Sequence, residues 1–473
     1  MNILDYKLYY FLGAGGIGMS ALVRYFNHYG KTVHGYDKTE TELTKQLQSE
    51  GVTLHFHEDA ALVKELFSKY KKEEILVIYT PAVPKDHAEF VYLQNNSYNL
   101  QKRAWVLGEI TKQFKTIAIA GTHGKTTTTT LVTHILKTAG INCFAFLGGI
   151  SQNYKTNLLL GDAFDKNAFV VVEADEYDRS FLTLHPYITV ITSVDADHLD
   201  IYGDANAMLQ TYTQFASQVQ KDGFLIVKKS VDNDLRLKDK RLIYSLNLDT
   251  EYSANSIEII DGEFCYNIKS PIEPVSHVAI GLPGLHNVEN SIAAVAVAQQ
   301  LGIKGDVINK ALRSFKGVKR RFDYRVKSKS VVYIDDYAHH PEELRAAITA
   351  AKQLYPDKKV TGIFQPHLFT RTRDFADGFA ETLDLLDVCV LLDIYPAREK
   401  PIEGINSQML LDKMKCNEKF LVKKENVLEF LKAHPPQVVM TLGAGDIDSL
   451  IEPIEELLSD KSEVISGSDN TIH

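Results

Sequence analysis

The stretch AGTHGKTTT at residues 120–128 constrains the fold of this chain more than any other feature. It follows a short apolar run at residues 116–119 and precedes a segment at residues 131–136 that can continue as a helix. A strand, a glycine loop, a Lys-Thr pair and a helix in this order can cradle phosphates, because backbone N–H groups turn inward and the helix N-terminus is partly positive. We therefore predict a nucleotide-binding α/β unit; the structural alternative is an ordinary β-α turn.

The spacing of the glycines in this loop limits the classes of nucleotide-binding protein to which it can belong. It reads G-x-x-G-K-T and not the common G-x-x-x-x-G-K-[ST], because Ile119 occupies the first glycine position. This short form, with His123 inside it, points away from GTPases and motor ATPases. Lys125 can reach the β- and γ-phosphates, and the Thr126 hydroxyl can bind Mg²⁺. The residues predicted to bind ATP here are Gly121, Thr122, His123, Gly124, Lys125, Thr126 and Thr127.

The composition of the chain limits its domain number, its cellular compartment and the kinds of molecule that it can bind. The 473 residues, with 45% hydrophobic and 24% charged residues, suffice for about two to four packed domains. A net charge of −9 argues against nucleic acid as a main partner. The 4 cysteines form no Cys-x-x-Cys pair, which excludes the familiar zinc sites and suits a reducing cytoplasm. With neither a signal-peptide pattern nor a membrane-length apolar run, we expect a cytoplasmic protein without membrane binding.

Residues 1–112 are predicted to form a Rossmann-like domain. Strand patterns at residues 7–12, 32–37 and 75–79 surround the glycine motif GAGGIG at residues 13–18. With an acid after the second strand, the motif matches the dinucleotide fingerprint, which both NAD and a UDP-sugar satisfy. The predicted contacts are Gly13, Gly15, Gly16, Gly18 and Asp37.

Residues 113–316 are predicted to form a second α/β domain around the phosphate loop. The apolar strand at residues 168–172 ends in Glu173, and the strand at residues 187–192 is followed by His198. Together with Thr126, these two residues form a candidate site for Mg²⁺. Because an imidazole is among the ligands, the site also suits Mn²⁺. The alternative for Glu173 is a solvated residue at the end of a strand, and the alternative for His198 is a histidine that caps the neighbouring loop. Asn287 and Asn290, in a helix near Val288, can contact a purine or cap that helix.

Residues 317–473 are predicted to form a third, Rossmann-like domain with a mobile tail from about residue 459. Strand patterns at residues 331–334, 360–364, 388–392 and 438–442 accompany a helix at residues 341–354. Polar residues follow the first two strands, at the edge where such sheets bind ligands. The candidates for substrate contacts are Tyr337, His339, His367, Arg371 and Arg373, and Arg321 is a candidate phosphate contact. The alternative for the candidate substrate contacts is a network of ion pairs within loops, and the alternative for Arg321 is a solvated pair of basic residues.

These candidate sites favour one class of reaction. Hydride transfer does not require the phosphate loop, and simple ATP hydrolysis does not require the first domain. A reaction that activates a carboxylate with ATP and joins it to an amine uses all three sites. A dehydrogenase and a non-catalytic nucleotide-sugar sensor remain the alternatives.

The ordered motifs resemble those of the Mur ligase family along nearly the whole chain. They are GAGGIGMS, AGTHGKTTT, EADEYDRSFL, DADHLDIYG, LPGLHNVENSIAA, GVKRRFD, DDYAHHPEE, FQPHLFTRTRDF and GAGDI. The resemblance implies an α/β fold of three domains: an N-terminal Rossmann-like domain that binds a UDP-sugar, a central P-loop ATPase-type sheet that binds ATP, and a C-terminal Rossmann-like domain that binds an amino acid. It also implies a cytoplasmic enzyme of peptidoglycan precursor synthesis. The sequence leaves open whether the protein is a monomer or a homodimer.

The implied reaction joins L-alanine to the lactyl carboxylate of UDP-N-acetylmuramate through an acyl phosphate and a tetrahedral intermediate. Members that add glutamate or a diamino acid carry a lysine shortly after the DH motif, and none stands between His198 and Lys221 here. The ligase that attaches a ready-made tripeptide shares DDYAHHP-like text, but FQPHLFTRTRD is more similar to the alanine-adding members.

By resemblance, Lys125, His198, His339 and Arg371 are the expected catalytic residues, and Thr126, Glu173 and His198 the metal ligands. Asn287 and Asn290 match positions near adenine. The chain departs from the family where Leu368 replaces an arginine, which removes one expected contact to the amino-acid carboxylate. Tyr177 and Ser193 also replace the serine and asparagine of many members.

Overall fold

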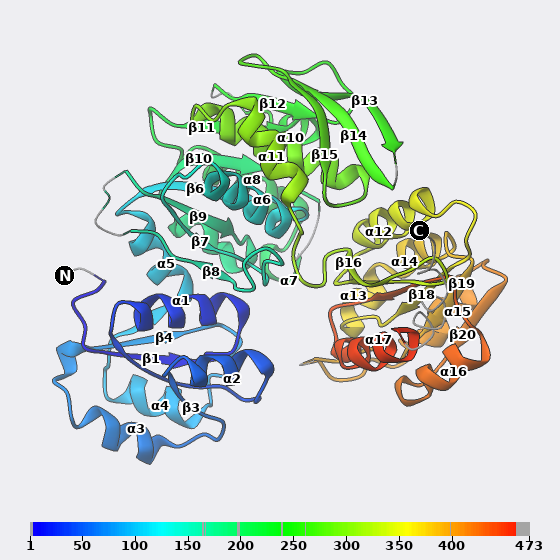
Figure 1. The fold of residues 1–473 in the computed structure, drawn as a ribbon. Helices are drawn as coiled ribbons and strands as arrows, with labels where there is room; N and C mark the ends of the chain where they lie inside the picture. The colour runs from blue at the N-terminus through cyan, green and yellow to red at the C-terminus, as the bar shows by residue number, and fades with distance from the viewer. Residues whose placement is uncertain are drawn as a thin grey trace, which may run out of the picture. The chain divides into compact units, whose positions relative to one another are not determined.

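The computed structural model describes residues 3–459 except 163, 164, 166, 196–198, 238, 239, 261 and 398. The described chain contains three β-sheets flanked by helices (Figure 1). It divides into two compact units, the first of which includes residues 3–256 and the second of which includes the sheet after Gly317.

The first sheet has five strands in the order β3-β2-β1-β4-β5, and all its pairs are parallel. The strands are β1 (Leu8–Leu12), β2 (Thr32–Tyr36), β3 (Thr53–His55), β4 (Ile75–Tyr79) and β5 (Leu100–Lys102). The helices are α1 (Ile17–His28), α2 (Glu42–Ser49), α3 (Ala60–Phe67), α4 (Ala88–Asn95) and α5 (Arg103–Thr111). All residues of β1 are buried, as expected for a central strand with helices on both faces. The chain reverses its direction of winding beside β1, which places the glycine motif at the switch point where such sheets bind ligands.

The second sheet has ten strands in the order β15-β14-β13-β12-β11-β10-β6-β9-β7-β8. The strands are β6 (Lys115–Ala120), β7 (Cys143–Phe146), β8 (Leu158–Leu159), β9 (Phe169–Ala174), β10 (Pro186–Ile191), β11 (Phe224–Lys228), β12 (Leu242–Ser245), β13 (Tyr252–Ile260), β14 (Glu263–Lys269) and β15 (Val275–Ile280). The helices are α6 (Lys125–Thr138), α7 (Leu199–Tyr202), α8 (Ala205–Ala216), α9 (Lys229–Leu235), α10 (Leu285–Gln300) and α11 (Gly305–Ser314). Because β6 lies between β9 and β10 and is parallel to both, the three carboxyl ends meet at one edge.

The third sheet has six strands in the order β16-β17-β21-β18-β19-β20. The strands are β16 (Asp323–Lys327), β17 (Val332–Asp336), β18 (Val360–Phe364), β19 (Val388–Leu391), β20 (Glu418–Leu421) and β21 (Val438–Leu442). The helices are α12 (Pro341–Leu354), α13 (Phe369–Asp374), α14 (Ala376–Leu383), α15 (Ser407–Lys413), α16 (Val427–Ala433) and α17 (Ile451–Ser459). Only β16 among these described strands pairs in the antiparallel sense, and β17, β18 and β21 are buried throughout.

The predicted α/β class is confirmed, and the predicted strands and helices lie within a few residues of the observed ones. No strand was predicted at β3, β5, β7, β8, β11, β16 or β20, nor at β12 to β15, which extend the second sheet. The tail predicted to be mobile lies outside the described residues after Ser459. Within the part of the chain that the structure describes, no helix is long and apolar enough to cross a membrane.

Candidate active site

The loop after β6 has the backbone shape of a phosphate cradle. Gly121 has a φ of +137°, and a Cβ added there would lie 2.1 Å from the Thr192 hydroxyl and 2.8 Å from the Ser193 nitrogen. Only glycine allows this approach of the loop to the segment after β10. Helix α6 then begins at Lys125, and no side chain caps its first turn. The backbone N–H groups of that turn, which includes Thr126 and Thr127, therefore face the position that a bound anion takes in such folds.

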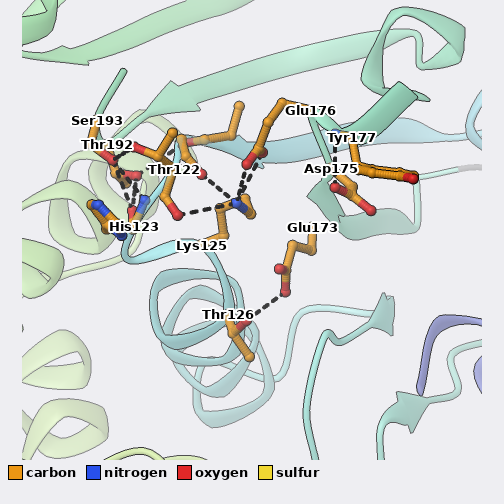
Figure 2. Close-up of polar contacts among 12 residues, drawn as sticks. Thr122, His123, Lys125, Thr126, Glu173, Asp175, Glu176, Tyr177, Thr192 and Ser193 are labelled. Carbon is orange, nitrogen blue, oxygen red and sulfur yellow. Dashed lines mark hydrogen bonds and ion pairs between the residues drawn. The ribbon is translucent and has the colours of Figure 1, made fainter. Parts of the chain in front are cut away.

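Hydroxyl groups after β10 hold this loop in place (Figure 2). The Thr192 hydroxyl donates to the Ala120 carbonyl at 3.1 Å and to the His123 carbonyl at 2.5 Å. The Ser193 hydroxyl accepts from the His123 nitrogen at 2.7 Å and lies 2.9 Å from the Thr122 hydroxyl. The cradle is thus fixed by neighbouring strands of the sheet, which lowers the cost of ordering it around a ligand.

Lys125 is paired with a buried carboxylate. Its ammonium lies 2.9 Å from the Glu176 carboxylate and donates to the Gly121 carbonyl at 2.5 Å (Figure 2). The Glu176 side chain is 2% exposed. Burial alone acts to lower the pKa of Lys125, but the carboxylates of Glu176, Glu173 and Asp175 outweigh it, so that the pKa is raised. Lys125 is therefore a fixed cation at neutral pH.

The predicted metal ligands Thr126 and Glu173 lie side by side. The Thr126 hydroxyl donates to the Glu173 carboxylate at 2.8 Å, from the first turn of α6 to the end of β9 (Figure 2). One hydroxyl and one carboxylate oxygen suit Mg²⁺, which prefers oxygen ligands and retains several waters. The third predicted ligand, His198, lies outside the described residues. Among the residues described, no group of three or more His, Cys, Asp and Glu side chains is arranged to bind a metal.

The two predicted adenine contacts lie in the first turns of α10. The Asn290 side-chain oxygen lies against the phosphate loop, where a Cβ on Gly124 would be 2.6 Å from it. Asn287 is 3% exposed, and its side-chain nitrogen donates to the Pro283 carbonyl at 2.7 Å. Asn290 thus belongs to the surroundings of the loop, whereas Asn287 also holds the turn before its own helix.

The glycine motif of the first sheet is closed around an acid. The Asp37 carboxylate accepts from the Gly15 nitrogen at 2.7 Å and from the Thr39 nitrogen at 3.1 Å. Gly16 caps the N-terminus of α1 without a side-chain hydrogen bond, and Gly13 and Gly18 flank it. Asp37 therefore lies at the motif, as predicted, and in this structure it supports the loop.

The edge of the third sheet gathers aromatic rings around His339. His339 Nδ1 lies 3.0 Å from the Tyr337 carbonyl and 3.2 Å from the Glu343 carboxylate. The ring centroid of His339 is 6.2 Å from that of His367, which stacks at 5.7 Å on Tyr395. Since Nδ1 faces two acceptors, it carries the proton, and Nε2 is left as the acceptor atom of the ring.

The charge state of His339 follows from its surroundings. The pKa of His339 is lowered to about 4, mainly by burial, with the Arg371 and Arg321 cations acting in the same direction and Glu343 acting against them. His339 is therefore neutral at pH 7. Arg321 lies 3.6 Å from Glu343, and its guanidinium is 5.4 Å from the centroid of the Tyr337 ring.

The remaining arginine of this edge has a different neighbour. Arg373 donates from Nε to the adjacent Asp374 at 2.7 Å, and both side chains are about half exposed. Leu368 has a φ of +71° and precedes α13. The structure thus brings His339, His367 and Arg371 into one electrostatic neighbourhood, whereas Arg373 is engaged in a local ion pair.

Several residues of these sites were not predicted. Four residues that contact predicted site residues or their loops had no predicted role: Asp175, Glu176, Thr192 and Arg103. The sequence EADE did show two further acids after Glu173. Their partners come from other strands, so only the sheet order, with β6 between β9 and β10, brings them together. A sequence signal existed for the two acids and none for Thr192 or Arg103.

Comparisons with known proteins agree with this architecture. Residues 8–115 match the model described as "Mur ligase family, catalytic domain", residues 119–298 match "Mur ligase middle domain", and residues 320–445 match "Mur ligase, glutamate ligase domain".

Curated relatives match along nearly their full length. The chain is 48% identical to the UDP-N-acetylmuramate–L-alanine ligase of Parabacteroides distasonis, over 97% of this chain and 98% of that protein. It is 47% identical to the ligase of the same name from Flavobacterium johnsoniae, over 97% of this chain and 100% of the relative. The crystal structure of UDP-N-acetylmuramate-alanine ligase MurC from Thermotoga maritima superposes with a TM-score of 0.81 at 27% identity, covering 96% of this chain and 99% of that one. The chain therefore belongs to the Mur ligase family.

Proposed function

We propose that this protein joins L-alanine to the lactyl carboxylate of UDP-N-acetylmuramate in an ATP-dependent reaction that releases ADP and phosphate. The observation that carries the proposal is the phosphate loop with its fixed Lys125 cation, in a chain similar over its length to ligases named for this reaction. We place the reaction in cytoplasmic peptidoglycan precursor synthesis, since 4 free cysteines suit a reducing compartment.

The three sheets divide the substrates among them in this proposal. Residues 1–112 bind the UDP-sugar, residues 113–316 bind ATP, and residues 317–473 bind the amino acid. The glycine motif at the switch point of the first sheet and the uncapped N-terminus of α6 support the first two assignments. Arg371, in the electrostatic surroundings of His339, supports the third because a guanidinium matches the alanine carboxylate.

ATP phosphorylates the lactyl carboxylate, so two anionic groups must approach each other. Lys125 and the first N–H groups of α6 stabilise the charge on the transferred phosphoryl group. Thr126 and Glu173 would hold Mg²⁺, with Mn²⁺ as an alternative, and His198 is the further proposed ligand. When bound, the ion neutralises phosphate charge and orients the γ-phosphate.

The alanine amine then attacks the acyl phosphate carbon, and phosphate leaves from the tetrahedral intermediate. The amine must be unprotonated to attack. His339 is neutral and presents Nε2 as an acceptor, so it can orient the amine by accepting its hydrogen. A group whose pKa is about 4 is a weak base, and His339 therefore acts mainly in positioning.

The experiment that tests this proposal is identification of the product. The protein is incubated with UDP-N-acetylmuramate, ATP, Mg²⁺ and isotopically labelled L-alanine, and the nucleotide fraction is analysed by mass spectrometry. Label joined to the UDP-sugar by an amide bond supports the proposal. Turnover of NAD with a hydroxy acid, without labelled product, would instead support the dehydrogenase alternative.

A further inference from the structure

An arginine lies directly against the glycine motif of the first sheet. Arg103 is the first residue of α5, and a Cβ added to Gly18 would be 2.8 Å from its Nη1 atom and 3.3 Å from its Cζ atom. A side chain at position 18 would therefore displace this guanidinium from its present place. The position where a UDP-sugar is proposed to bind therefore has a cation built into it.

Arg103 is anchored by an acid of the ATP-binding sheet. Its Nη2 atom donates to the Asp175 carboxylate at 3.1 Å, while the other oxygen of Asp175 accepts from the Tyr177 nitrogen at 3.0 Å (Figure 2 shows the latter contact). The side chains of Arg103 and Asp175 are 23% and 38% exposed. The guanidinium is thus held at one end by Asp175 and lies over Gly18 with its other end.

Neighbouring contacts hold the same two segments together. The Lys102 ammonium lies 2.6 Å from the Asp178 carboxylate, and the Thr183 hydroxyl donates to the Ala104 carbonyl at 2.8 Å. The first turn of α5 is therefore fixed against the segment after β9 by more than one contact. The ion pair of Arg103 with Asp175 is thus one of several contacts at this junction.

Arg103 also lines a small pocket with the proposed metal carboxylate. The pocket walls include Arg103, Asp175 and Glu173, with apolar side chains such as Leu107 and Phe181 behind them. The pocket has room for no more than about one water, so it identifies the neighbours of Arg103 and is not itself a binding cavity.

We infer that Arg103 binds an anionic group of the UDP-sugar, with Asp175 as the residue that positions it. The group is either the diphosphate or the lactyl carboxylate, since a guanidinium recognises both. This inference rests on the proposed function, because it takes the UDP-sugar as the ligand of the first sheet. It adds a recognition residue that bridges the glycine motif and the acids after β9.

The test compares the binding of four ligands by titration calorimetry: UDP, UDP-N-acetylglucosamine, UDP-N-acetylmuramate and a non-hydrolysable ATP analogue. The variants are Arg103→Gln, Arg103→Lys and Asp175→Asn, and Lys102→Gln is the matched control, since it removes a cation from the adjacent ion pair. Arg103→Gln is expected to weaken UDP-N-acetylmuramate about tenfold or more and to leave the ATP analogue unchanged. Arg103→Lys is expected to recover part of the loss.

The ligand set identifies which group is bound. If Arg103 contacts the diphosphate, UDP and UDP-N-acetylglucosamine weaken together with UDP-N-acetylmuramate. If it contacts the lactyl carboxylate, only UDP-N-acetylmuramate weakens, because the other two ligands lack that group. Either pattern supports the inference. Asp175→Asn keeps the cation and is expected to give a smaller loss of the same pattern, which tests the inference even if Arg103→Gln does not fold.

Two results would overturn the inference. The first is that folded Arg103→Gln binds UDP-N-acetylmuramate as tightly as the wild type. The second is that Arg103→Gln and Arg103→Lys weaken the ATP analogue as much as the UDP-sugars, as expected of a purely structural ion pair. A wild-type protein that binds no UDP-sugar would instead overturn the proposed function, and this inference with it.

Discussion

The Lys125 ammonium lies 2.9 Å from the Glu176 carboxylate, which is almost completely buried. This pair joins the first residue of α6 to the segment after β9, and Lys125 also donates to the Gly121 carbonyl of the phosphate loop. The lysine that is proposed to contact ATP is therefore held beside the loop by groups of the protein itself. Glu176 touches no substrate in this account, and its effect is on the position and charge of Lys125.

We predict that Glu176→Gln lowers kcat about tenfold, because a charge-assisted hydrogen bond is replaced by a weaker neutral one. Without the carboxylate, the buried ammonium loses the largest influence that raises its pKa, so activity is expected to fall further as the pH rises. The measurement is kcat and KM for ATP between pH 7 and pH 10. Glu109→Gln, which removes a more exposed acid from the Glu109–Lys112 ion pair, is the matched control. A pH profile of Glu176→Gln that coincides with the wild type would contradict the assigned role.

A second prediction concerns the loop backbone. Gly121→Ala forces a Cβ to within 2.1 Å of the Thr192 hydroxyl, in addition to the strain of a positive φ. We expect a loss of about 2 kcal/mol or more in the free energy of unfolding, together with loss of ATP binding. Gly140→Ala is the control, because Gly140 has a φ of +71° and nothing within 4 Å of the added Cβ. Urea unfolding measures both variants, and equal losses would mean that the close approach at Gly121 does not matter.

A third prediction concerns the metal. Glu173→Gln replaces a carboxylate that lies 2.8 Å from the Thr126 hydroxyl, and Mg²⁺ binds a neutral amide less tightly. The Mg²⁺ concentration needed for half-maximal activity is expected to rise about tenfold or more. Thr133→Ala, farther along α6, removes a hydroxyl that bonds its own helix and should leave this concentration unchanged. An unaltered Mg²⁺ titration of Glu173→Gln would remove Glu173 from the metal site.

The pH dependence of stability gives a fourth prediction. The pKa of His339 is lowered from 6.5 to about 4, so between these values the unfolded chain binds a proton that the folded chain does not. Stability therefore falls as the pH falls through this window, by at most about 1.4 kcal/mol per pH unit for this residue. His339→Asn is expected to lose that part of the slope. Urea unfolding between pH 7 and pH 5 measures it, and parallel curves for wild type and variant would refute the lowered pKa.

The framework of the fold follows from the sequence because its signals are local. The runs that become β4, β18 and β21 are continuous apolar segments bounded by polar residues, and Pro341 stands at the first position of α12. Strands β12 to β15 escaped prediction because they are more exposed and mixed in pattern; the burial of β13, for example, ends after its third residue. Their place in the sheet depends on neighbours far away in the chain.

The residues of the candidate sites likewise fall into those that a local sequence pattern predicts and those that it does not. The spacing of the glycines, Lys125 and Thr126 in the sequence predicts their role, and Glu173 is predicted because it follows an apolar strand. Thr192 and Arg103 carry no such signal, because each acquires its partner only when β10 pairs with β6 or when α5 meets the segment after β9. The charge state of His339 likewise depends on burial and on neighbouring charges that no local pattern reveals.

The most direct test of the central claim is phosphate release by the wild-type protein. UDP-N-acetylmuramate, ATP and Mg²⁺ are combined with each amino acid singly, and each component is also omitted in turn. We predict sustained phosphate release with L-alanine, in a one-to-one ratio with the new amide, and none when the UDP-sugar is left out. Absence of phosphate release with every amino acid would contradict the ligase assignment, and release with a tripeptide alone would replace L-alanine as the acceptor.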